Sequence, residues 1–293
     1  MRVLILGATG MLGHKVWQVL RERHEAHAAA RGERAAWARY GLFEADRFHG
    51  GLEAGNPDSL LQILGAVRPD VVVNCVGIVK QVAAATDPLA SFTVNALFPH
   101  RVAAACQVAD ARLIHISTDC VFSGRKGGYT EADVPDAEDL YGRSKLLGEV
   151  SGPRCLTLRT SIIGRELFRQ SGLLEWFLAN RQGKVQGYTN AVFSGFTTQT
   201  LGGMLAWLIE DQPALAGLYH VASEPISKYV LLKKVAKAFG LDTAIEPYAE
   251  YRCDRSLDAS RFQTATGWRP PSWDAMVEAL AADPTPYDHW RQT

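Results

Sequence analysis

Two short groups of residues in this chain have the types and spacing that chemistry requires. Near the N-terminus, Gly7, Gly10 and Gly13 recur at every third position directly after an apolar run. Glycines in a turn that opens a helix let a phosphate approach the backbone, where free N–H groups and the helix dipole favour negative charge. Far along the chain, Tyr141 and Lys145 stand four residues apart, so a helix would present both on one face.

A tyrosine beside a lysine can protonate a carbonyl oxygen. A free tyrosine has a pKa of about 10, and a nearby ammonium group favours the phenolate and lowers that pKa. Thr118 follows an expected strand and can hold the substrate oxygen between its own hydroxyl and that of Tyr141. Lys145 can also hydrogen-bond a nicotinamide ribose. Combined with a pyrophosphate cradle, these features predict hydride transfer with a nicotinamide cofactor, and the catalytic residues are Thr118, Tyr141 and Lys145.

Each motif also has a purely structural interpretation. The glycine spacing is G-x-x-G-x-x-G rather than the usual G-x-G-x-x-G, and a tight turn between packed elements needs no ligand. A tyrosine and a lysine four residues apart are common on helix surfaces. We favour the functional interpretation because the glycine loop follows a strand, opens a helix and occurs in the same chain as Thr118 and Tyr141.

The elements that must position these residues alternate between strand and helix. Apolar runs predict strands at residues 3–6, 26–30, 70–75, 111–117, 155–159 and 217–221. Helices are expected at 11–23, 59–67, 88–108, 139–150, 173–181, 199–210 and 227–239, whereas residues 41–57 fit no element. This pattern predicts an α/β fold with a Rossmann-type, doubly wound parallel sheet, followed by a smaller C-terminal lobe. Ligands of such sheets bind at the carboxyl ends of the strands.

The strand ends therefore define a cofactor site. Arg31 follows the second strand, where an arginine can pair with the 2′-phosphate of NADPH, so we expect NADPH in preference to NADH. The backbone of residues 74–77 ends a strand beside the glycine loop and can line the cofactor. The predicted cofactor-binding residues are Gly7, Thr9, Gly10, Met11, Leu12, Gly13, Arg31, Asn74, Cys75, Val76, Gly77, Ser117, Tyr141 and Lys145.

Composition narrows the class of protein. Lys and Arg together number 31, equal to Asp and Glu, so no basic excess indicates a nucleic-acid or membrane partner. The first apolar run is too short for an export signal, and no stretch approaches the roughly 20 apolar residues of a spanning helix. Five cysteines without C-x-x-C spacing predict a reduced, cytoplasmic protein. Eight scattered histidines suggest no metal site.

These motifs make the chain resemble a known family. It is similar to the extended short-chain dehydrogenase/reductases and, within them, to the dTDP-4-dehydrorhamnose reductase group. The run Ser-Thr-Asp-Cys-Val-Phe-Ser-Gly at 117–124 is the part most specific to that group. Other matching stretches are residues 7–13, 72–77, 141–149, 158–161, 217–221, 226–229 and 255–258.

The resemblance implies reduction of the 4-keto group of a nucleotide-linked deoxysugar, with the family's threonine, tyrosine and lysine at Thr118, Tyr141 and Lys145. It also places Asp119, Phe193 and Ser194, besides Thr118, near the substrate. The implied domains are an NAD(P)-binding domain, residues 1–168 plus about 192–222, and a nucleotide-sugar-binding lobe, about 169–191 plus 223–293.

Two departures from the family leave the substrate open. Cys120 stands where members often carry Tyr, and Ile162 replaces an aromatic residue. One alternative substrate is therefore a UDP-2-acetamido-2,6-dideoxyhexos-4-ulose. Alternative functions are a nucleotide-sugar epimerase and a non-catalytic, cofactor-binding regulatory subunit. The sequence does not fix the oligomeric state, and a homodimer stays open.

Overall fold

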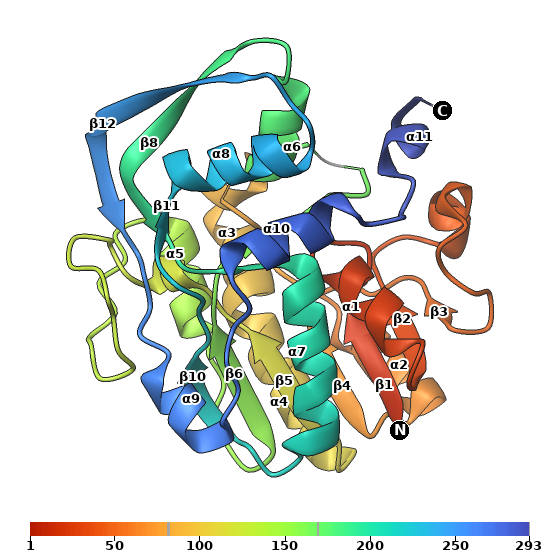
Figure 1. The fold of residues 1–293 in the computed structure, drawn as a ribbon. Coiled ribbons are helices and arrows are strands. Elements are labelled where there is room, and N and C mark those ends of the chain that lie inside the picture. Colours follow the sequence, from red (N-terminus) through yellow and green to blue (C-terminus); the bar gives the residue numbers. More distant parts are fainter. Residues whose placement is uncertain (81–82, 169, 293) are drawn as a thin grey trace.

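The computed structural model describes residues 1–80, 83–168 and 170–292, and its centre is a seven-stranded parallel sheet (Figure 1). The strand order is β10-β6-β5-β4-β1-β2-β3, and every neighbouring pair is parallel. The expected Rossmann-type α/β fold is thereby confirmed. The strands are β1 (Arg2–Leu6), β2 (Glu25–Ala29), β3 (Phe48–His49), β4 (Val71–Asn74), β5 (Arg112–Ile116), β6 (Cys155–Arg159) and β10 (Gly217–His220).

Helices cover both faces of this sheet because its strands carry apolar side chains on both sides. In β1, Val3 and Ile5 join the core cluster that contains α1 (Gly13–Leu20) and α7 (Thr198–Asp211). The alternate residues of β1 join a second cluster with α2 (Pro57–Val67) and α4 (Phe98–Val108) on the opposite face. Both clusters are continuous with β4, so the middle of the sheet is the most deeply buried part.

The strand order reverses between β1 and β4. The chain leaves β1 toward β2 on one side, and it leaves β4 toward β5 on the other. Loops that diverge in this way open a crevice at the carboxyl edge, which is where ligands of doubly wound sheets bind. The glycine loop follows β1, residues 75–77 follow β4, and Ser117 follows β5, so all three segments lie at this carboxyl edge.

A second, three-stranded sheet lies above the carboxyl edge in the view of Figure 1. It has the order β11-β8-β12, formed by β11 (Ile226–Ser227), β8 (Lys184–Phe193) and β12 (Ala244–Asp254), with α6 (Leu173–Ala179) and α8 (Lys228–Ala238) beside it. Helix α8 is capped by Ser227, whose side chain accepts from Val230 N. The expected division into two domains stays a prediction, and Arg169, at its first boundary, lies outside the described residues.

The remaining elements refine the expectations. The helix expected at 88–108 is three consecutive segments, α3 (Pro88–Ser91), the π-helix η3 (Phe92–Leu97) and α4. The helix expected from residue 11 begins only at Gly13, because residues 7–12 form turns. Further elements are η1 (Arg34–Tyr40), η2 (Ala83–Thr86), η4 (Asp119–Val121), α5 (Leu140–Leu147), β7 (Ile162–Ile163), β9 (Phe196–Thr197), α9 (Ser260–Thr266), α10 (Trp273–Ala281) and α11 (Tyr287–Gln292).

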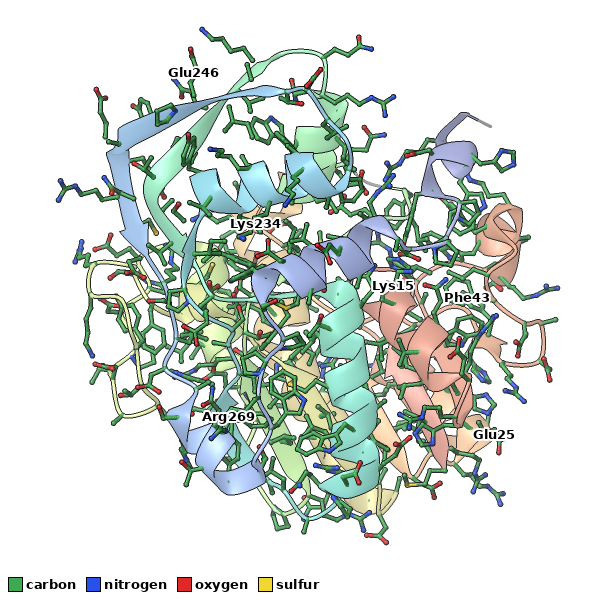
Figure 2. All side chains as sticks on the ribbon, in the orientation of Figure 1. Lys15, Glu25, Phe43, Lys234, Glu246 and Arg269 are labelled. Atoms are coloured by element: carbon green, nitrogen blue, oxygen red, sulfur yellow. The ribbon has the colours of Figure 1, made fainter. Side chains whose placement is uncertain are left out.

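The chain returns to the glycine loop at its C-terminal end. Asp283 forms an ion pair with Lys15 of α1 at 2.5 Å, and both side chains are buried. Figure 2 shows Lys15 at the end of α1 that faces this segment. Four residues after Asp283, the Tyr287 hydroxyl lies 2.7 Å from His14 Nε2. Residues 283–292, called the C-terminal strap below, therefore fasten the start of α1.

All five cysteines are free thiols. Within residues 1–80, 83–168 and 170–292, no three His, Cys, Asp or Glu side chains gather in a way that could hold a metal ion. No helix in these ranges is long and apolar enough to cross a membrane.

Candidate active site

The glycine loop is shaped by close backbone contacts. A Cβ atom on Gly13 would lie 2.2 Å from the carbonyl oxygen of Gly7, so a side chain at position 13 would force the turn apart. Gly10 N donates to the same carbonyl at 3.0 Å, and Gly10 itself is exposed. The helix that follows, α1, begins at Gly13, and Leu12 before it forms no side-chain capping hydrogen bond. An anion over the exposed part of the loop would therefore meet the positive end of α1.

The segment after β4 joins this loop to Lys145. Gly7 packs against Cys75 and Val76, since a Cβ atom added to Gly7 would lie 3.0 Å from their backbone. A Cβ atom on Gly77 would lie 4.0 Å from Lys145 Nζ. Burial raises the pKa of the Cys75 thiol to about 12, and Lys145 opposes this effect. The two predicted motifs, distant in sequence, thus border one segment of three residues.

Thr118 and Tyr141 meet because α5 packs closely against the turn after β5. A Cβ atom on Gly142 would lie 2.2 Å from the carbonyl oxygen of Cys120, so glycine is what allows this approach. Asp139 caps the helix by accepting from Gly142 N at 2.7 Å. Burial raises the pKa of Tyr141, while a hydrogen bond with the Thr118 side chain acts in the opposite direction. The fold therefore brings α5, which carries Tyr141, against the turn that carries Thr118.

Lys145 is buried below this pair, and its Nζ donates to the carbonyl oxygen of Ile116 at 2.8 Å. Burial lowers the pKa of Lys145 to about 8, while Glu149 and Cys75 favour the charged form. We expected Lys145 to lower the pKa of Tyr141, but in the protein alone the shift of Tyr141 is upward. Burial is the larger effect on Tyr141, and the phenol therefore carries its proton at neutral pH.

The side chains of several predicted cofactor-binding residues form hydrogen bonds or packing contacts within the protein. Asn74 is fully buried, accepts from Val76 N at 3.1 Å and lies 3.2 Å from His115 Nδ1, so it shapes the turn after β4. The Ser117 hydroxyl donates to Glu149 at 2.7 Å. Leu12 belongs to the core beside α1. For Asn74 and Ser117, backbone atoms are what remain to border a cofactor.

Thr9, Met11 and Arg31 are exposed to solvent to different degrees. Thr9 and Met11 are half-buried, and the Met11 side chain reaches Gly172, just before α6. Arg31 is exposed two residues after β2, and its carbonyl oxygen accepts from Trp37 Nε1 at 3.3 Å. Arg31 therefore follows the second strand, and its pairing with a 2′-phosphate stays a prediction.

Asp119 lies next to Thr118, whereas the Phe193 and Ser194 side chains form structural contacts. Burial raises the pKa of Asp119, and hydrogen bonds from Cys120 and Thr118 act in the opposite direction, as does the charge of Arg255. Phe193 packs on Trp273 with ring centroids 5.5 Å apart, and the Ser194 hydroxyl accepts from Leu257 N. The structure therefore brings Asp119 to Thr118 but gives the other two residues structural contacts.

Sequence reasoning missed Asn95, which lies in the π-helix η3. Its side chain accepts from Ile78 N at 2.8 Å, and its Nδ2 donates to Ile78 O and to Ser144 Oγ. Asn95 thus fixes the segment after β4 against α5, one residue from Lys145. The sequence carries no clear signal for it, because Asn95 is one of several polar residues in an alanine-rich stretch and periodicity does not show which of them are buried.

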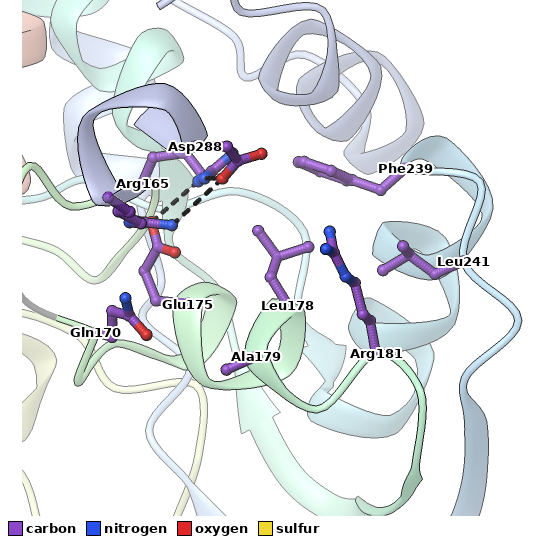
Figure 3. A pocket seen from close by; sticks show the side chains of 10 residues that line it. Arg165, Gln170, Glu175, Leu178, Ala179, Arg181, Phe239, Leu241 and Asp288 are labelled. Carbon is purple, nitrogen blue, oxygen red and sulfur yellow. Dashed lines mark hydrogen bonds and ion pairs between the residues drawn. The ribbon is translucent and has the colours of Figure 1, made fainter. Parts of the chain in front are cut away.

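A cavity of about 520 Å³ lies beside α6 and α11, away from the predicted residues (Figure 3). Arg165 forms ion pairs there with Glu175 at 3.0 Å and with Asp288 at 2.5 Å. None of the residues predicted for catalysis or cofactor binding lines this cavity. The convergence of the glycine loop, Thr118, Tyr141 and Lys145 instead makes the carboxyl edge of the large sheet the candidate active site.

Comparisons with known proteins identify relatives that match nearly the whole chain. A probable low-salt glycan biosynthesis reductase, Agl14 of Haloferax volcanii, is 27% identical over 96% of this chain and 98% of that protein. The methionine adenosyltransferase 2 subunit beta of Bos taurus is also 27% identical, over 100% of this chain and 90% of its own length.

A solved structure shows the same fold. The dTDP-4-dehydrorhamnose reductase of Bacillus anthracis, crystallised in complex with NADP, has a TM-score of 0.78 at 23% identity and covers 95% of this chain and 96% of its own. The family model described as the RmlD substrate binding domain matches residues 1–285, which confirms the resemblance drawn from the sequence. This chain therefore belongs to the RmlD substrate-binding-domain family.

Proposed function

We propose that this protein is an NAD(P)H-dependent reductase of the 4-keto group of a nucleotide-linked deoxysugar, with NADPH as the preferred cofactor. The observation that carries the proposal is the close packing of α5, which carries Tyr141 and buried Lys145, against the turn that carries Thr118, at the edge that the glycine loop also borders. The Bacillus anthracis relative is itself a dTDP-4-dehydrorhamnose reductase solved with NADP. The five free thiols suit the reducing cytoplasm that we expect for such an enzyme.

The residues present fit a nicotinamide dinucleotide. The glycine loop keeps side chains away from the uncapped start of α1, so this loop would hold the pyrophosphate. Arg31 would face the 2′-phosphate, and the backbone of residues 74–77 would border the ribose and nicotinamide side. When bound, the reduced cofactor supplies the hydride that the C4 carbonyl accepts.

The side chains of the catalytic edge then bind the C4 carbonyl oxygen of the substrate and supply its proton. Thr118 hydrogen-bonds the carbonyl oxygen of the substrate and orients it toward Tyr141. Tyr141, protonated because burial raises its pKa, gives its proton to the alkoxide that forms at C4. The ammonium group of Lys145 stabilises the phenolate left behind. Asp119, whose pKa is also raised by burial, lies beside Thr118 and orients the turn that carries it.

Replacing Tyr141 by Phe tests the assignment directly. We expect kcat for keto-sugar reduction to fall by about 100-fold or more, because general acid catalysis is lost. NADPH affinity, measured by fluorescence, should change little. Tyr248→Phe is the matched control, since it removes a hydroxyl from the second sheet. Turnover of Tyr141→Phe at the wild-type rate would refute the proposed role.

The sugar, the nucleotide and the cofactor are tested with one panel of substrates. Purified protein is mixed with dTDP-, UDP- and GDP-linked 4-keto-6-deoxysugars, including the UDP-2-acetamido-2,6-dideoxyhexos-4-ulose, with NADPH or NADH. We expect oxidation of NADPH to exceed that of NADH. Arg31→Ala should narrow the preference for NADPH over NADH, whereas Arg34→Ala, at the start of η1, is the control.

A second candidate is a regulatory subunit. The Bos taurus relative is the beta subunit of methionine adenosyltransferase 2, and the match covers 90% of its length. Such a protein would bind NADPH without oxidising it in the presence of any keto sugar of the panel. The complete set of Thr118, Tyr141 and Lys145 favours the reductase. NADPH binding without turnover across the whole panel would favour the regulatory subunit.

A further inference from the structure

A buried ion pair lies behind the catalytic edge and has no part in the chemistry proposed above. Arg159 of β6 donates from Nε to Glu149 Oε1 at 2.8 Å and from Nη2 to Glu149 Oε2 at 2.7 Å. Arg159 is 3% exposed, and Glu149 follows the end of α5 by two residues. Two parallel hydrogen bonds of this kind fix the orientation of a carboxylate as well as its position.

The same carboxylate holds the strand that carries Thr118. Ser117 Oγ donates to Glu149 Oε1 at 2.7 Å, and Ser117 directly precedes Thr118. One residue earlier, the carbonyl oxygen of Ile116 accepts from Lys145 Nζ at 2.8 Å. Lys145 and Glu149, four residues apart in sequence, therefore bind two consecutive residues at the end of β5. This double attachment sets the distance between Thr118 and α5, and hence between Thr118 and Tyr141.

Glu149 also provides the negative charge that Lys145 needs. Lys145 is almost completely buried, and burial favours its neutral form, whereas Glu149 favours the ammonium form. From other elements, Cys75 after β4 and His115 of β5 face Lys145, and burial keeps both of these uncharged near neutral pH. On its far side Glu149 faces Arg159, which lies 3.2 Å from His220 Nε2. Glu149 is thus the one carboxylate among the groups named here that acts on Lys145.

We propose that Glu149, held by Arg159, is a positioning residue that keeps Lys145 charged and locks Ser117 and Thr118 against α5. Its catalytic consequence rests on the proposed function, because that function assigns Lys145 and Thr118 their roles. The charge on Lys145 can be measured without any substrate, so the electrostatic part of the proposal stands or falls independently.

The first experiment follows Lys145 by NMR in protein labelled with ¹³Cε-lysine and free of cofactor. The Lys145 signal is identified by its loss in Lys145→Arg. We expect a titration midpoint near pH 8 in the wild type, and a midpoint about one pH unit lower in Glu149→Gln. Ser117→Ala, which removes a hydrogen bond but no charge, should keep the wild-type midpoint. An unchanged midpoint in Glu149→Gln would overturn the proposal.

Glu149→Gln leaves Arg159 charged and buried, which can prevent folding. The paired variant Glu149→Leu with Arg159→Met removes both charges and keeps the volume, a replacement that buried ion pairs often tolerate. We expect this double variant to fold and to show the same downward shift of the Lys145 midpoint. A folded double variant with the wild-type midpoint would overturn the proposal.

The second experiment measures keto-sugar reduction against pH. We expect activity to decline above the pKa of Lys145, and this alkaline limb should move down by about one pH unit in Glu149→Gln. In Ser117→Ala the limb should stay in place while kcat falls about tenfold, because Thr118 is held less firmly. Glu149→Asp keeps the charge and should restore the position of the limb. Equal limbs in the wild type and in Glu149→Gln would refute the catalytic part, and a wild type without turnover would refute the proposed function alone.

Discussion

The two ends of the candidate site are built on different principles. At the glycine loop, the surface offered to a ligand is backbone, and it is shaped by the absence of side chains at Gly7 and Gly13. At the catalytic edge, the surface consists of the Thr118, Tyr141 and Lys145 side chains, two of them buried. A short local motif is enough to specify the first end. The second end requires that β5, β6 and α5 come together before its groups meet.

Both ends are nevertheless fastened from behind by a buried ion pair. Lys15 and Asp283 join α1 to the C-terminal strap, and Arg159 and Glu149 join β6 to α5. A buried pair of this type adds little net stability, but it permits few alternative arrangements of the elements it joins. The two ion pairs differ in sequence separation. Lys15 pairs with Asp283, far away in the sequence, whereas Glu149 and Arg159 are near neighbours in the sequence.

If the two ends function separately, a substitution at one end should leave the function of the other unchanged. The largest effect is expected from Gly13→Ala. The new Cβ atom would lie 2.2 Å from Gly7 O, which must open the turn. We expect NADPH affinity to fall by at least about 100-fold, or roughly 2.7 kcal/mol. Gly203→Ala is the matched control, because no atom lies within 4 Å of its added Cβ. Wild-type affinity in Gly13→Ala would show that the loop does not hold the cofactor.

Acidification should act on the glycine-loop end through His14. Burial lowers the pKa of His14 to about 4, whereas the unfolded chain titrates near 6.5. The unfolded state therefore binds more protons as the pH falls from about 6.5 to 4, so stability is lost over that window, by about 3 kcal/mol from this residue. Urea unfolding at several pH values measures the loss.

The control for this titration is a second histidine. His14→Gln should show a shallower loss of stability toward acid than the wild type, whereas His100→Gln, an exposed site, should keep the wild-type slope. Identical slopes in His14→Gln and in the wild type would contradict the contribution of His14.

The mirror image of the Gly13 experiment is Gly142→Ala. Here the added Cβ atom would lie 2.2 Å from Cys120 O and would push α5 away from the turn that carries Thr118. We expect kcat to fall roughly 10- to 100-fold, since small displacements of catalytic groups have effects of this size. NADPH affinity should remain near that of the wild type. Equal losses of affinity in Gly142→Ala and Gly13→Ala would mean that the two ends act as one unit.

The same contrast explains what the sequence could predict. The glycine loop, the buried strands and the Tyr141–Lys145 pair are each encoded within a few residues, so periodicity and spacing reveal them. Strands β8 and β12 were missed, because they pair across about 60 residues and because Gly187 and Pro247 interrupt their residue patterns. Asn95 was missed because nothing local marks a buried amide that bonds Ile78 and Ser144.

The direction of the Tyr141 pKa shift was also beyond sequence reasoning. Spacing shows that Lys145 shares a helix face with Tyr141, but it does not show how deeply either group is buried. The fold places Lys145 Nζ on Ile116 O, and burial then dominates the titration of the phenol. Long-range packing therefore decided the electrostatics, although local spacing had identified the residues correctly as neighbours on one helix.

The smallest expected effect comes from Tyr287→Phe, which removes one hydroxyl from the C-terminal strap. That hydroxyl lies 2.7 Å from His14 Nε2, and His14 Nδ1 lies 2.7 Å from Gly10 O, so the strap reaches the glycine loop through one imidazole. With Nδ1 donating to the carbonyl, Nε2 accepts from Tyr287. Loss of one buried hydrogen bond amounts to about 1 kcal/mol, so NADPH affinity should weaken about fivefold.

This variant also decides whether the strap belongs to the glycine-loop end alone. If it does, kcat at saturating NADPH stays at the wild-type value, and Tyr248→Phe, which removes a hydroxyl bonded to Glu250 on the second sheet, leaves NADPH affinity intact. In a double-mutant cycle, Tyr287→Phe and His14→Gln should be non-additive, because each breaks the same path to Gly10. Additive losses of affinity would show that the strap and His14 support the loop separately.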